Sequence, residues 1–107
     1  SHCRVATGCL VSDRPCGFDV EYIRKAKPEL VHYTMSPAEA EAIFSSPFPD
    51  IAFTRLWTRK EAVLKLTGTG ITDSLHSVLS PDRLQGIVLK TIENPWLGYV
   101  ITSAILS

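Results

Sequence analysis

The sequence lacks both a long hydrophobic run and a net charge. No apolar run approaches the roughly 20 residues that cross a bilayer, and the N-terminus lacks the basic-then-apolar order of a secretory signal. Eleven basic residues balance eleven acidic ones, which removes the usual electrostatic argument for nucleic acid or an anionic membrane as the main partner. We therefore expect a cytoplasmic protein in which local charge carries recognition.

The sequence also lacks a cysteine motif for zinc and a glycine-rich motif for phosphate. The three cysteines, Cys3, Cys9 and Cys16, lack the C-x-x-C spacing of zinc sites, so we expect small buried apolar side chains. The segment 67–70 contains two glycines but lacks the spacing and the following Lys of a phosphate-binding P-loop. A helix end at Gly68 is the simpler interpretation.

The chain has no initiating Met, and an apolar, strand-like stretch begins at Cys3. A first strand that is exposed needs a cover or a pairing partner, so we expect upstream residues or a second subunit in the working molecule. With 107 residues, 45% of them hydrophobic, the chain suits one compact domain over residues 1–107 that is marginally stable alone.

The first part of the chain predicts a β-hairpin. Residues 3–11 and 16–23 have strand composition, and the turn-forming cluster 12–15 lies between them. Side chains two apart in a strand share a face, so Asp19 and Glu21 should project together. Their neighbours Phe18 and Val20 are expected to point into the core.

Helical signals dominate the middle of the chain. They predict a short helical or irregular piece and two helices, at residues 29–33, 37–44 and 51–66. Ser36 and Glu39 match a capping box, and Asp50 is the expected cap of the longest helix. Strand-forming residues return afterwards, at residues 75–79, 86–92 and 97–106. This order predicts an α+β domain in which an antiparallel sheet packs against a long helix.

The charged residues of the second strand and of the long helix suggest a site. Asp19 and Glu21 alone are typical of a solvent-facing strand end, and Glu61 and Lys65 alone are spaced for an ordinary helix ion pair. If the helix packs on the sheet, however, the three carboxylates meet, and Mg²⁺ fits them because it also takes phosphate oxygens. Lys60 and Lys65 would then serve that phosphate.

Two motifs resemble those of a known family, the 4′-phosphopantetheinyl transferases of the larger, two-halved kind. The run Gly17-Phe18-Asp19-Val20-Glu21 resembles its G-[IV]-D-[IV]-E motif. The run from Trp57 to Gly70 resembles its W-[ST]-x-K-E-[AS]-x-x-K-x-x-G-x-G motif. Ser1-His2 falls where that family has a Ser-His pair. The likeness spans nearly the whole chain and corresponds to the C-terminal half of a pseudo-dimer.

The resemblance implies a function and roles for individual residues. Mg²⁺ would be bound by Asp19, Glu21 and Glu61, while Lys60, Lys65 and His2 would contact phosphates of coenzyme A. The reaction would move 4′-phosphopantetheine from coenzyme A to a serine of an acyl or peptidyl carrier protein. Glu61 would be the general base and Lys65 would stabilise the leaving adenosine 3′,5′-bisphosphate.

Two alternatives remain open at this point. One is a non-catalytic domain that binds coenzyme A or a carrier protein, although the intact acids and lysines argue against loss of activity. The other is the short, homotrimeric holo-acyl-carrier-protein synthase type. Its length fits, but the Ser1-His2 start and the internal position of the Gly17–Glu21 run fit it less well.

Overall fold

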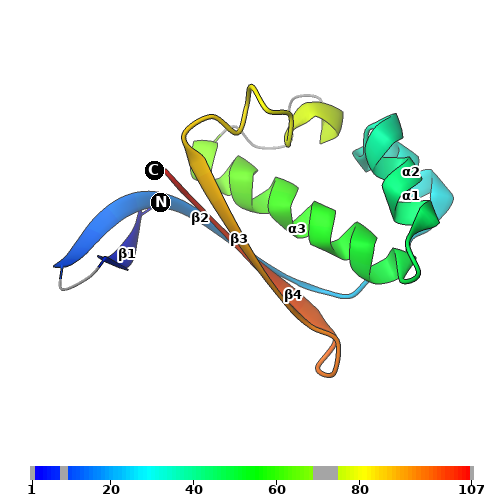
Figure 1. The fold of residues 1–107 in the computed structure, drawn as a ribbon, viewed down its shortest axis with the longest axis horizontal. Coiled ribbons are helices and arrows are strands. Elements are labelled where there is room, and N and C mark those ends of the chain that lie inside the picture. Colours follow the sequence, from blue (N-terminus) through cyan, green and yellow to red (C-terminus); the bar gives the residue numbers. More distant parts are fainter. Residues whose placement is uncertain (1, 8–9, 69–74, 107) are drawn as a thin grey trace.

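The computed structural model describes residues 2–7, 10–68 and 75–106, with side chains for residues 15–68 and 75–106. The elements follow in the order β1 (His2–Thr7), β2 (Leu10–Tyr22), α1 (Pro28–Thr34), α2 (Pro37–Ser45), α3 (Pro49–Thr67), the 3₁₀ turn η1 (Leu75–Ser77), β3 (Ile87–Asn94) and β4 (Tyr99–Leu106). Figure 1 shows the long helix α3 lying along one face of the sheet, with α1 and α2 near its N-terminal end. The expected α+β arrangement is confirmed. Among the described residues, no helix is both long and apolar enough to span a membrane.

The sheet has the order β1-β2-β4-β3, and every neighbouring pair is antiparallel. Strand β2 changes partner along its length, because Pro15 lies opposite His2 of β1 whereas Cys16 lies opposite Ile105 of β4. The expected turn at residues 12–15 is therefore wrong, since these residues continue β2. Proline has no N–H to donate to a ladder, and Pro15 stands where one ladder gives way to the next.

The buried and exposed faces of β2 are the opposite of those expected. Asp19 is only 4% exposed, whereas Phe18 and Val20 are about half exposed, at 52% and 49%. The predicted alternation holds, but α3 covers the face that carries Gly17, Asp19 and Glu21. The expectation that Phe18 and Val20 face the core is thus wrong, because the strand pattern fixes which residues share a face and not which face the helix covers.

The caps of the helices agree only in part with the expectation. Ser36 and Glu39 form the predicted capping box at the start of α2. Helix α3 begins earlier than expected, with Phe48 at the N-cap, so Asp50 is not its cap. The Asp50 carboxylate instead accepts a hydrogen bond from the Ala26 backbone N–H at 2.8 Å. This contact ties the connection before α1 to the start of α3.

The expected strand at residues 75–79 is wrong, and η1 occupies its first part. Leu75 and Val78 are both buried, and their three-residue spacing is that of a helical turn rather than of a strand. The two later strands are confirmed as β3 and β4. Gly68 ends α3 in the left-handed conformation, with φ of +70°, as predicted.

Two hydrophobic clusters form the core, and Trp57 packs against both. One contains Val31, Met35, Ile43 and Phe53 from the three helices, and the other contains Ala62 and Val63 of α3, Val78 just after η1 and Ala104 of β4. Cys16 is buried as expected, at 2% exposed, but it is disulfide-bonded, which corrects the expectation that it is only a small apolar side chain. The side chains of Cys3 and Cys9 lie outside the described part.

Candidate metal and phosphate site

Three residues of α3, Trp57, Glu61 and Lys65, recur at intervals of four and so share one face of the helix. This face lies over β2. Gly17 allows the close approach, because a Cβ at that position would lie 1.8 Å from the Ala62 carbonyl oxygen. The strand and the helix therefore touch through their backbones just beside Asp19.

Only one of the two carboxylate oxygens of Asp19 has a hydrogen-bond partner among the described residues. Its Oδ1 accepts a hydrogen bond from the Lys65 Nζ at 2.7 Å, and the same ammonium donates to the Phe18 carbonyl oxygen at 3.3 Å. Its Oδ2 is buried and has no hydrogen-bond partner among the described residues. A buried carboxylate oxygen left in this way is costly unless a cation or a donor reaches it.

Glu21 is held by two donors, Trp57 and Arg24, that are not among the predicted site residues. The Trp57 indole Nε1 donates to its Oε1 at 3.1 Å, and the Arg24 guanidinium lies 3.4 Å from the same oxygen. Trp57 could have been found from spacing, because it lies one helical turn before Glu61. Arg24 could not, because it lies beyond the end of β2, where the two-residue period of a strand no longer applies.

Glu61 completes the group of acids. Burial raises the pKa of its carboxyl, and the nearby negative charges of Asp19 and Glu21 raise it further, while Lys65 and Arg24 oppose the shift. The hydrogen bond to Asp19 is the main cause that raises the pKa of Lys65, which therefore stays protonated at neutral pH. The site thus holds a half-exposed ammonium beside three acids, two of which disfavour the charged form of Glu61.

The chemistry of these donors fits a hard divalent cation. As the side chains stand, no three His, Cys, Asp or Glu residues within the described ranges are gathered closely enough to hold a metal ion. The unpartnered Asp19 Oδ2 and the raised pKa of Glu61 nevertheless mark a place where added positive charge would relieve strain. Magnesium coordination by Asp19, Glu21 and Glu61 stays a prediction that these two observations favour.

Lys60 lies outside this group. Its side chain is fully buried, and its Nζ donates to the Glu39 carboxylate and to the carbonyl oxygens of Thr34 and Leu75. An ammonium has three N–H donors, so none is left for a ligand. This placement argues against the expected phosphate contact of Lys60. The side chain of His2, the other expected phosphate contact, lies outside the described part.

Comparison with known proteins identifies the family to which the chain belongs. Residues 15–100 match the model of the 4′-phosphopantetheinyl transferase superfamily. The chain is also 36% identical over 90 residues to a 4′-phosphopantetheinyl transferase of Bacillus pumilus. That match spans 79% of this chain but only 39% of the relative's length. On the strength of these matches and the two motifs meeting at the β2–α3 seam, this chain belongs to the 4′-phosphopantetheinyl transferase superfamily.

Proposed function

We propose that this chain forms the metal- and phosphate-binding part of an enzyme that transfers 4′-phosphopantetheine from coenzyme A to a serine of an acyl or peptidyl carrier protein. The observation that carries the proposal is the meeting of Asp19, Glu61 and Lys65, in which an ammonium and mutually repelling acids lie side by side. Such a site suits a diphosphate that arrives with Mg²⁺. The cytoplasmic location stays a prediction.

The proposed reaction is a phosphoryl-type transfer. The serine oxygen attacks the phosphorus that carries the pantetheine arm, the bond from that phosphorus to the bridging oxygen breaks, and adenosine 3′,5′-bisphosphate leaves. Glu61 takes the serine proton, directly or through a water, and its raised pKa suits a base that works near neutral pH. Lys65, half exposed, offers its positive charge to the leaving bisphosphate. When bound, Mg²⁺ would neutralise charge on the diphosphate.

The open face of the sheet supports a companion half. Phe18, Val20, Tyr22, Val88 and Ile92 project from the face opposite α3, and each is about half exposed or more. A contiguous apolar surface of this kind marks an interface. We assign it to a second half of the same protein, because the matched relative is much longer than the segment it shares with this chain. A second copy of the chain is the competing occupant.

The test uses the full-length protein that carries these residues. Wild type should add the mass of 4′-phosphopantetheine to an acyl or peptidyl carrier domain in the presence of coenzyme A and Mg²⁺. A Glu61→Gln variant should fold and bind coenzyme A but lose transfer, whereas Glu41→Gln, at an exposed position of α2, should not change it. Coenzyme A binding by wild type without transfer to any carrier would favour a non-catalytic binding domain.

A further inference from the structure

We propose that Lys60 is a positioning residue, which fixes the rotation of α3 so that Glu61 faces the acids of β2. The proposal deepens the proposed function and rests on it for its readouts of Mn²⁺ and coenzyme A binding. It begins from an unusual fact, which is a lysine with 0% of its side chain exposed. A buried ammonium persists only where fixed partners replace its water.

The three acceptors around Lys60 belong to three different elements. The Lys60 Nζ lies 2.9 Å from the carbonyl oxygen of Thr34, the last residue of α1. It lies 2.6 Å from the Oε1 of Glu39, in the first turn of α2, and 2.6 Å from the carbonyl oxygen of Leu75, the first residue of η1. One side chain of α3 therefore joins every other helical element of the described chain.

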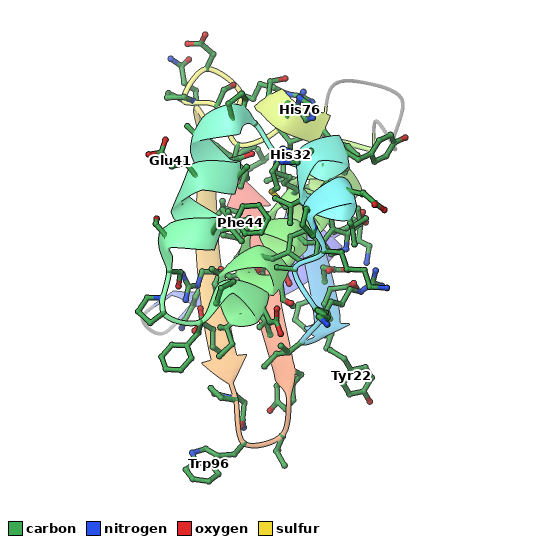
Figure 2. The ribbon with its side chains drawn as sticks, turned by 90° about the vertical axis from the view of Figure 1, so that its right-hand side faces the viewer. Tyr22, His32, Glu41, Phe44, His76 and Trp96 are labelled. Carbon is green, nitrogen blue, oxygen red and sulfur yellow. The ribbon has the colours of Figure 1, made fainter. Side chains whose placement is uncertain are left out.

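Neighbouring bonds make this junction rigid. The same Glu39 Oε1 accepts the Ser36 backbone N–H at 2.8 Å, so the carboxylate that neutralises Lys60 also caps α2. The His76 Nε2 donates to the carbonyl oxygens of His32 and Tyr33, at 3.0 and 3.1 Å. Figure 2 shows His76 beside His32, where η1 meets the end of α1. Lys60 and His76 together satisfy the last carbonyl groups of α1.

The consequence for the site follows from helix geometry. Successive residues of a helix are about 100° apart, so fixing Lys60 toward the helical layer turns Glu61 toward the sheet. On the sheet side, the backbone contact between Gly17 and Ala62 sets the distance. Lys60 sets the rotation. Without it, α3 can turn about that contact and the Glu61 carboxylate can leave Asp19.

The first experiment tests the junction by urea unfolding of the full-length protein. Glu39→Gln leaves a buried ammonium without its counter-charge and should lower the urea midpoint by more than about 1 M. Adding Lys60→Met to that variant should raise the midpoint again, because the uncompensated charge is removed. If the two substitutions simply add, Lys60 and Glu39 are not coupled and the proposal fails. Lys25→Met, at an exposed lysine, is the control and should leave the midpoint unchanged.

The second experiment separates positioning from phosphate binding. In Lys60→Met, the affinity for coenzyme A in metal-free buffer should fall by less than in Lys65→Met, because the long, half-exposed Lys65 side chain keeps its charge near the site when α3 turns. The Mn²⁺ affinity measured by electron paramagnetic resonance should fall about tenfold. Lys65→Met should instead weaken coenzyme A. A loss of coenzyme A affinity in Lys60→Met as large as that in Lys65→Met, or an unchanged Mn²⁺ affinity, would overturn the proposal. If wild type binds neither probe, the proposed function fails, and the unfolding pattern alone decides the Lys60–Glu39 pair.

Discussion

Gly17 of β2 lies against Ala62 of α3 so closely that any side chain at Gly17 would enter the helix backbone. A Cβ there would be 1.8 Å from the Ala62 carbonyl oxygen and 2.6 Å from the Leu66 nitrogen. This glycine is required by space, because its neighbours are backbone atoms that cannot rotate away. The contact holds the acids of β2 within reach of Glu61, one residue before Ala62.

Gly17→Ala should therefore separate the strand from the helix. Overpacking of this kind costs about 3 kcal/mol or somewhat more in the free energy of unfolding, and transfer should be lost with it. Urea unfolding of the full-length protein measures the first effect. Glu41→Ala, at an exposed position of α2 away from the open face of the sheet, should change the free energy by less than about 0.5 kcal/mol. Equal stability of Gly17→Ala and wild type would show that α3 does not approach β2 as described.

Glu61→Gln should stabilise the metal-free protein at neutral pH. The pKa of Glu61 is raised in the folded protein above the ordinary 4.5, so the unfolded chain loses this proton first. Stability contributed by the protonated carboxyl is fully present below pH 4.5 and is lost as the pH rises through the raised pKa. The variant keeps a neutral side chain, so its advantage over wild type should be larger at pH 7 than at pH 4.

The measurement is the urea midpoint of both proteins at the two pH values, in buffer with a chelator. Magnesium should then reverse the order at pH 7, because it binds wild type more tightly and stabilises it by mass action. An advantage of Glu61→Gln that is the same at both pH values would contradict the raised pKa.

Trp57→Phe should weaken metal binding more than it weakens folding. Phenylalanine keeps most of the packing between the two core clusters but removes the indole N–H that holds Glu21 Oε1. Loss of a partner that orients a metal ligand commonly costs about tenfold or more in affinity. Mn²⁺ binding measured by electron paramagnetic resonance checks the effect. Trp96→Phe is the matched control, because Trp96 is 96% exposed at the tip of the β3–β4 turn (Figure 2) and should leave the affinity unchanged.

Val20→Lys should disrupt the companion interface without touching the acid site. Val20 projects from the open face of the sheet, whereas Asp19 and Glu21 project from the other. If the two halves are expressed as separate chains, a lysine at this position should weaken their association at least about tenfold, because its charge would be buried against an apolar surface. Calorimetry checks this, with Phe48→Lys as the control away from the open face. Self-association of the chain lost in Val20→Lys would identify a second copy as the occupant.

Much of the local structure could be predicted from the sequence. The capping box of Ser36 and Glu39, the stop at Gly68 and the strands β3 and β4 depend on neighbouring residues, and all were confirmed. The turn expected at residues 12–15 was wrong. The local composition favours a turn, but these residues pair with β1 and stay extended. Strand pairing is a long-range interaction, so the sequence could not decide it.

The candidate site shows the same division. The spacing of Trp57, Glu61 and Lys65 already placed them on one face of a helix, and the spacing of Asp19 and Glu21 placed them on one face of a strand. Lys60 could have been separated from them by the same rule, because an adjacent helical residue points about 100° away. That its ammonium is enclosed by α1, α2 and η1 depends on how distant segments pack.

The sequence by itself determined the period of each element, the motifs that identify the family and the residue types available for metal and phosphate. Only the tertiary structure decided which face of β2 meets α3, and with it that Asp19 is buried while Phe18 is exposed. The physical reason is that a two-residue period is satisfied equally by either face. Gly17 permits this choice, because the absence of a Cβ there lets the Ala62 carbonyl oxygen come within contact distance of the strand.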